Sequence, residues 1–125
     1  MCVSDRGAGS AATFPSRLFH YTDEAGFEGI GKTGVLHASL QTGPRGDAFY
    51  GDGQYFTDIA PGRMSREDIA YIIYRDPQQE FRLTHCLEIH TQGLDITFAR
   101  EHIYRVPGST DLKISSRRIY LGKIY

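Results

Sequence analysis

The chain has 125 residues, of which 40% are hydrophobic and 23% are charged, and its formal net charge is -1. This length is enough for one hydrophobic core and too short for two, and the composition is typical of an ordinary soluble globular protein. The near-neutral charge excludes a general electrostatic attraction for nucleic acid or for an anionic membrane, so partners have to be inferred from local sites.

The only cysteines in the sequence are Cys2 and Cys86. One pair cannot form the multiple-disulfide framework of a small secreted scaffold. The N-terminal segment lacks the apolar stretch of a signal peptide, and no apolar run is long enough to span a bilayer. We therefore expect a soluble chain with reduced thiols and no membrane partner, either cytoplasmic or the effector domain of a longer secreted protein.

The first elements in chain order are an arm, a strand and a helix. Residues 1–16 are small, Gly- and Ala-rich and aperiodic, which predicts a flexible arm before a single domain over residues 17–125. Residues 18–22 predict a short strand with His20 at its centre. Thr22 is placed to cap a helix that ends at Gly34, and a short strand over residues 35–37 follows.

The middle of the chain predicts a loop, a turn, a strand and a second helix. Small and turn-forming residues over 41–47 predict a loop beside the Gly51-Asp52-Gly53 turn, which leads into a strand at 55–57. Ser65 predicts the cap of a helix in which isoleucines recur at helical spacing, and Asp76-Pro77 ends it.

The last part of the chain predicts a sheet. Alternating apolar residues indicate strands around 87–89, over 103–106 and over 118–121. Two helices and several short strands, without regular βαβ alternation, predict an α+β fold with mainly antiparallel pairing.

Two motifs resemble the ADP-ribosyltransferase superfamily. Residues 18–22 read Leu-Phe-His-Tyr-Thr, and residues 50–58 read Tyr-Gly-Asp-Gly-Gln-Tyr-Phe-Thr-Asp. Their order is similar to that of the small toxin-type domains named for a His-Tyr-Asp set, and the second motif also resembles the Gly-x-Tyr-Phe strand of poly(ADP-ribose) polymerases. The similarity extends from about Phe19 to Tyr120.

This resemblance implies a fold, a substrate and a class of reaction. The implied fold is a split antiparallel β-sheet core with two helices, in which NAD lies in a cleft between the halves of the sheet. The implied enzyme is an ADP-ribosyltransferase or NAD glycohydrolase of toxin or effector type, with NAD as substrate and no metal. The acceptor is a protein, a nucleic acid or water, and an immunity or carrier protein is a further expected partner.

The resemblance also assigns roles to residues of the two motifs. The ring of Tyr55 suits stacking on nicotinamide, and His20 suits a hydrogen bond to a ribose hydroxyl. The backbone of Tyr21 is expected to hold the carboxamide. Thr22 and Gly53 complete the expected NAD-binding set.

Cleavage of the nicotinamide–ribose bond also calls for a carboxylate near the positive charge that develops on the ribose. Glu101 is the first candidate, because the polymerase-like relatives carry a Glu at the start of the corresponding strand. Asp111, in the following turn, is the second, since the toxin-type families are described by an Asp, and Asp58 is the third. If none of them reaches the ribose, the domain is a module that binds NAD or a protein without turnover.

Three other patterns have simpler explanations. Residues 26–33 fit the phosphate-loop pattern G-x-x-x-x-G-K-T, but acidic residues precede them where a buried strand is required, so we expect a helix end with Lys32 in its last turn. Strand alternation places His85 opposite Cys86 and His90, which argues against a metal site. The tripeptide at 45–47, Arg-Gly-Asp, lies in a Gly-rich loop and carries little weight.

Overall fold

The computed structural model describes residues 14–43 and 48–124. Most of the predicted arm, residues 1–13, and the tripeptide at 45–47 lie outside the described residues. The elements are β1 (Arg17–Thr22), α1 (Glu24–Thr33), β2 (Val35–Leu36), β3 (Gly53–Thr57), α2 (Arg66–Tyr74), the 3-10 helix η1 (Pro77–Arg82), β4 (His85–His90), β5 (Thr97–Arg100), β6 (Ile103–Pro107), β7 (Leu112–Lys113) and β8 (Arg118–Lys123).

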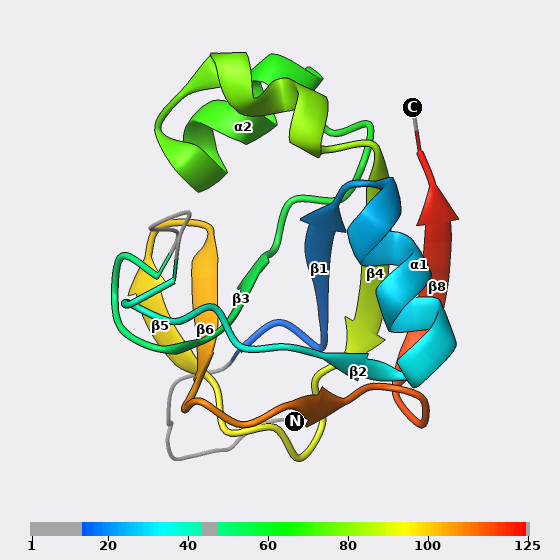
Figure 1. Cartoon of the computed structure of the whole chain (residues 1–125). Helices are drawn as coiled ribbons and strands as arrows, with labels where there is room; N and C mark the ends of the chain where they lie inside the picture. Colours follow the sequence, from blue (N-terminus) through cyan, green and yellow to red (C-terminus); the bar gives the residue numbers. More distant parts are fainter. Residues whose placement is uncertain (1–13, 44–47, 125) are drawn as a thin grey trace, which may run out of the picture.

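The strands form two antiparallel sheets, which confirms the α+β prediction. The larger sheet has the order β5-β6-β3-β1-β4-β8, and β2 pairs with β7 in the smaller one (Figure 1). Strands β1 and β4 are paired along their whole length, whereas β1 and β3 share the single paired position Phe19↔Thr57. The larger sheet therefore consists of two three-stranded parts that meet at one position.

Helix α1 begins one residue later than its predicted cap. Asp23, not Thr22, is the N-cap, and its carboxylate accepts a hydrogen bond from the Gly26 backbone at 2.9 Å. Thr22 cannot cap the helix because it is still the last residue of β1. Gly34 ends α1 as predicted, in the left-handed conformation that glycine adopts without a Cβ penalty (φ 72°). The phosphate-loop pattern is helical, with Lys32 in the last turn.

Helix α2 agrees with its predicted cap and end, but a helix that was not predicted follows it. The Ser65 side chain accepts from the Asp68 backbone at 3.1 Å, and the helix stops before Asp76-Pro77. Residues 77–82 then form η1. The Asp76 carboxylate accepts from the Gln78 backbone at 3.0 Å, and Pro77 fits a first helical turn because it needs no amide donor there. The strand predicted around residues 87–89 is β4, which begins after η1 at His85.

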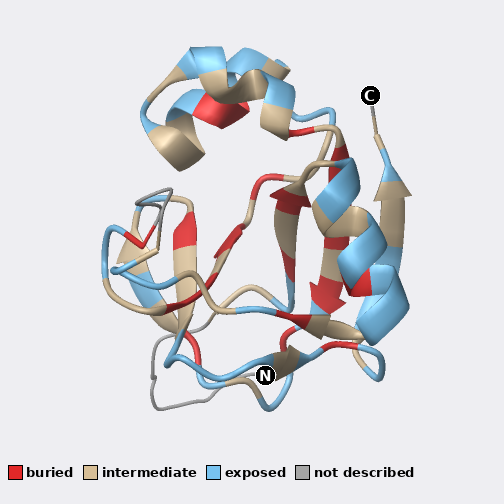
Figure 2. Cartoon of the chain, viewed as in Figure 1, coloured by how far each residue is buried: buried red, intermediate tan, exposed pale blue. Residues whose placement is uncertain are grey.

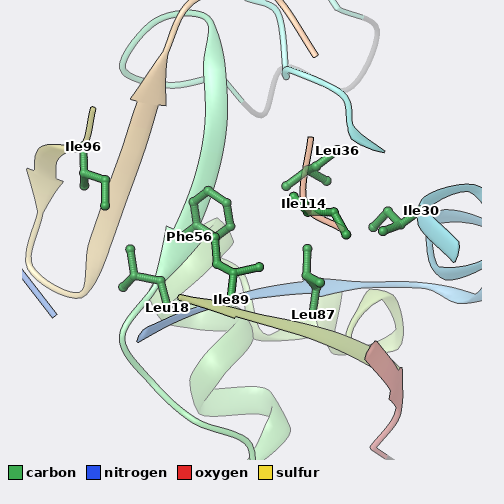
Figure 3. Close-up of a cluster of buried hydrophobic side chains, with 8 residues drawn as sticks. All are labelled: Leu18, Ile30, Leu36, Phe56, Leu87, Ile89, Ile96 and Ile114. Atoms are coloured by element: carbon green, nitrogen blue, oxygen red, sulfur yellow. The ribbon is translucent and has the colours of Figure 1, made fainter. Parts of the chain in front are cut away.

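Two hydrophobic clusters pack on opposite sides of the larger sheet. The first joins the sheet to α1, β2 and the segment after β7, and Figure 3 shows its members: Leu18, Ile30, Leu36, Phe56, Leu87, Ile89, Ile96 and Ile114. The second joins Tyr21 and Cys86 of the sheet to Ile69 and Ala70 of α2. Figure 2 shows that buried residues concentrate along the central strands. Strand alternation accounts for the two faces, since Leu87 and Ile89 point to one side and Cys86 to the other.

No helix in the described part of the chain combines the length and the apolar character needed to cross a membrane.

Candidate active site

A cavity of about 260 Å³ is lined by residues of both β1 and β3. Its walls come from β1, β3, both helical segments of residues 66–82, the turn end of the β5–β6 hairpin and the loop before β3. The lining residues of most interest are His20, Tyr21, Thr22, Tyr55, Arg82 and Arg100. The two sequence motifs therefore meet at one cavity.

His20 is held in a defined tautomer. Its Nδ1 lies 2.8 Å from the backbone carbonyl oxygen of Tyr55. A carbonyl oxygen only accepts, so Nδ1 carries the proton and donates it to this bond. Burial lowers the pKa of His20, and this effect outweighs the opposing one of the Tyr55 carbonyl. In the neutral ring Nε2 is an acceptor, and His20 lines the cavity, so it suits a ligand hydroxyl.

The lowered pKa of His20 predicts a loss of stability in acid. The unfolded chain takes up a proton near the ordinary pKa of 6.5, while the folded chain does so only at lower pH. The free energy of unfolding of the parent should therefore fall as the pH decreases below about 6.5 and level off below the folded pKa. Chemical denaturation of the parent and of His20→Gln from about pH 7.5 to about pH 5 checks this. An equal pH slope in both proteins would contradict it.

Tyr55 is anchored through its hydroxyl. That group donates to the Gly51 carbonyl oxygen at 2.6 Å and accepts from the Tyr50 backbone at 2.9 Å. Burial raises the pKa of the Tyr55 hydroxyl, which keeps it protonated as a donor. Because both bonds go to the turn before β3, they fix the ring at the cavity wall and tie the turn to the ring.

Gly53 serves the same turn and does not itself line the cavity. It is buried and pairs with Ser39 through two backbone hydrogen bonds of 2.8 and 3.0 Å. A Cβ at Gly53 would meet the carbonyl oxygen of Val106. The Arg105 guanidinium, which the sequence did not single out, donates to the Asp52 carbonyl at 2.8 Å. Gly53 and Arg105 thus position the turn to which the Tyr55 hydroxyl is hydrogen-bonded.

Tyr21 and Thr22 both line the cavity, and the ring of Tyr21 belongs to the core. Its hydroxyl donates to the Ile59 carbonyl oxygen at 2.8 Å within the second hydrophobic cluster. The Thr22 carbonyl accepts from the Thr84 backbone on the β4 side of β1. Backbone groups of successive strand residues point to opposite sides, so those of Tyr21 point toward β3. This is the direction in which the cavity lies.

The three candidate carboxylates all lie outside the cavity lining, and two of them, Glu101 and Asp58, lie against the same residue, His102. Glu101 is in the turn between β5 and β6, and 89% of its side chain is exposed. Asp111 is exposed beside β7, where its carboxylate lies 2.7 Å from Nδ1 of His37. Asp58 accepts from Nδ1 of His102 at 2.8 Å. Among the residues that the structure describes, the carboxylate that does line the cavity is Asp23, which follows the first motif directly and caps α1.

Two arginines of the cavity had no sequence signal of their own. Arg82 of η1 lies over the ring of Tyr74, with its guanidinium carbon 4.1 Å from the ring centre. Arg100 of β5 donates to the Ile73 carbonyl oxygen at 3.2 Å. Together they give this wall of the cavity positive charge, and guanidinium groups are well suited to phosphate oxygens.

The residues considered for a metal have structural surroundings. The ring of His85 is buried and stacks on Phe27, with ring centres 4.5 Å apart. Burial raises the pKa of Cys86 to about 12, so its thiol stays protonated. His90 is exposed. Within residues 14–43 and 48–124, no group of three or more His, Cys, Asp or Glu side chains is arranged to hold a metal ion.

Comparison with known families gives one match. A family described as "HYD1 signature containing ADP-ribosyltransferase" matches residues 18–118, a span that runs from β1 to the first residue of β8 and contains His20 and Tyr55. No curated protein and no solved structure matches the chain. ADP-ribosyltransferases use NAD as their substrate. The matched span covers most of the chain, which therefore belongs to the toxin-type ADP-ribosyltransferases with the HYD1 signature.

Proposed function

We propose that the domain binds NAD in the cavity between β1 and β3 and breaks the bond between nicotinamide and ribose, passing ADP-ribose to a macromolecular acceptor or to water. The observation that carries the proposal is the hydrogen bond between His20 and the Tyr55 carbonyl, which joins two motifs that lie 35 residues apart at one cavity wall.

The nicotinamide end of NAD is assigned to the two motifs. The ring of Tyr55 stacks on nicotinamide, and Nε2 of His20 accepts a ribose hydroxyl. The backbone of Tyr21 holds the carboxamide, and the direction of its backbone groups supports this role. Thr22 borders the same end of the cavity. NAD then lies between the two parts of the sheet that meet at Phe19↔Thr57, as in a split-sheet core.

The pyrophosphate is assigned to Arg82 and Arg100. NAD carries two negative phosphates, and both arginines line the same cavity as the β1 motif. Charge-assisted hydrogen bonds to phosphate are among the strong polar interactions in binding sites. The position of the arginines favours NAD over an uncharged nucleoside as the ligand of this cavity.

Glu101 is proposed as the carboxylate that stabilises the positive charge on the ribose. Its chain neighbour Arg100 and the nearby Ile103 both line the cavity. Its side chain is exposed at a hairpin turn and is free to adopt another rotamer. Asp111 lies beside the smaller sheet, and Asp58 is hydrogen-bonded to His102. Both are therefore weaker candidates than Glu101 for the carboxylate that acts on the ribose.

A second candidate function is a binding module without turnover. It is favoured by one observation, that none of Glu101, Asp111 and Asp58 lines the cavity. In either case the family match supports a toxin or effector role, and an immunity or carrier protein belongs to that role as a proposed partner.

The test combines thermal stability with product analysis. NAD should raise the melting temperature, because a ligand that binds the folded state stabilises it by about 2.7 kcal/mol at a hundredfold excess over Kd. ATP with magnesium should do much less, and Lys32→Ala should respond to NAD like the parent, since Lys32 ends α1. Chromatography of the NAD mixture should show nicotinamide release.

The outcomes separate the two functions. Protection by NAD without nicotinamide release would favour the binding module. Absence of both effects would contradict the proposed function. If ATP raises the melting temperature more than NAD does, and Lys32→Ala abolishes that rise, the ligand site would instead be at α1.

A further inference from the structure

A second cavity, of about 250 Å³, lies on the other side of Arg100. Its lining residues come from the end of α2 and from the β5–β6 turn: Tyr71, Ile72, Arg75, Arg100, Glu101 and His102. Arg100 lines both cavities and donates to the Ile73 carbonyl oxygen at 3.2 Å, so this turn docks on α2 between them. The second cavity is thus next to the proposed NAD site.

His102 lines this cavity, and its ring is oriented by Asp58. Its Nδ1 lies 2.8 Å from the Asp58 carboxylate, and the other oxygen of that carboxylate accepts from the Tyr104 hydroxyl at 3.4 Å. An ionised carboxylate only accepts, so in the neutral ring Nδ1 carries the proton and Nε2 has the lone pair. Nε2 lies 3.8 Å from the Glu101 carboxylate. A histidine oriented by an aspartate in this way is a common general base.

The charges around His102 come from several elements. Asp58 follows β3, Arg100 ends β5, Glu101 shares the turn, Tyr104 lies on β6 and Arg75 follows α2. Burial, reinforced by the neighbouring Asp58, raises the pKa of the Tyr104 hydroxyl, which therefore remains a donor to that carboxylate.

We propose that the second cavity receives the acceptor of the ADP-ribosyl group, that this acceptor is a neutral hydroxyl, and that His102 removes its proton. The inference rests on the proposed function. The bond from ribose C1′ to the nicotinamide nitrogen breaks, and its electron pair neutralises the pyridinium ring. The hydroxyl oxygen bonds to C1′, and its proton passes to Nε2 of His102 and then to solvent.

The choice of a hydroxyl follows from the same groups. A carboxylate acceptor has no proton to lose at neutral pH and would be repelled by Asp58 and Glu101. A guanidinium acceptor has a pKa above about 12, beyond the reach of an imidazole base. A neutral hydroxyl needs the base and meets no repulsion. Water and an alcohol share this chemistry, and methanol serves as the probe that distinguishes them.

The test compares the parent, His102→Asn and His37→Asn. Asn is chosen because residue 102 has a φ of 69°, which Asn tolerates better than Ala does. His37 is the matched control: its Nδ1 also lies against an aspartate, at 2.7 Å from Asp111, but it borders neither cavity. Nicotinamide, ADP-ribose and O-methyl ADP-ribose are measured in NAD mixtures with and without methanol, across a range of pH.

His102→Asn should lower kcat by about a hundredfold, within the usual range for loss of a general base, while KM and the thermal shift with NAD stay unchanged. The parent's activity should rise with pH, because a general base acts only in its unprotonated form. The activity of the variant should lack this rise with pH, and added imidazole should restore part of the variant's rate. Asp58→Asn should give a smaller loss, and His37→Asn should match the parent.

Several results would overturn the inference. One is that the parent cleaves NAD and the His102→Asn variant has the same rate and pH profile as the parent. This result leaves the proposed function intact. Faster transfer to free arginine than to methanol would exclude a hydroxyl acceptor. A parent that binds NAD but releases no nicotinamide would contradict both the transferase proposal and this inference. O-methyl ADP-ribose identifies an alcohol site, and ADP-ribose as the sole product identifies water; both support a hydroxyl acceptor.

Discussion

Glu101→Gln is expected to lower nicotinamide release by about a hundredfold or more while NAD affinity stays nearly unchanged. The carboxylate is proposed to act on the positive charge that develops on the ribose, so its loss costs more in the transition state than in the bound substrate. Gln keeps the size of the side chain and removes only the charge. Turnover by chromatography and Kd by calorimetry separate the two effects.

The other two carboxylates are the comparison for Glu101. Asp111→Asn should change turnover much less, because Asp111 lies beside the smaller sheet with His37. Asp58→Asn should act through His102, and therefore alter the pH dependence, whereas Glu101→Gln should lower the rate at every pH. A large loss in Asp111→Asn with little change in Glu101→Gln would transfer the role to Asp111. If neither changes the rate, Asp58 remains as the candidate.

Tyr55→Ala is expected to weaken NAD binding by about 1–3 kcal/mol, the scale for loss of a well-used aromatic face. Tyr55→Phe should give a smaller loss. This substitution keeps the ring but removes the hydrogen bonds to Tyr50 and Gly51. Each of these bonds stabilises the turn by about 1 kcal/mol. Calorimetric Kd values for NAD measure both changes.

Tyr120→Ala is the matched control for Tyr55. Tyr120 is an exposed tyrosine on β8, and its hydroxyl donates to the Lys123 carbonyl at 3.0 Å, outside the proposed NAD cavity. It should bind NAD like the parent. If both Tyr55 variants also bind like the parent, Tyr55 has a structural role and the proposed nicotinamide site is wrong.

Local signals in the sequence predicted most of the helices and strands. The Gly34 end of α1, the Ser65 cap of α2 and the alternation of β4 each depend on residues within a few positions. The misses have local causes as well. Asp23 competed with Thr22 for the same cap, and Asp76-Pro77 ends one helix and starts another. Strands as short as β7 have too few residues to show a period.

The sequence by itself determined the α+β fold class and the order of the two motifs, and it singled out His20 and Tyr55 as candidates, because each motif is contiguous in the chain. Only the tertiary structure decided what surrounds that pair. Arg82 and Arg100 enter the cavity from η1 and β5, and Asp58 meets His102 across a separation of 44 residues. The positions of these side chains depend on how β1 and β3 meet at Phe19↔Thr57 and on how α2 packs over the sheet. Such long-range packing leaves no periodic pattern in the chain, which is why the cavity could not be read from it.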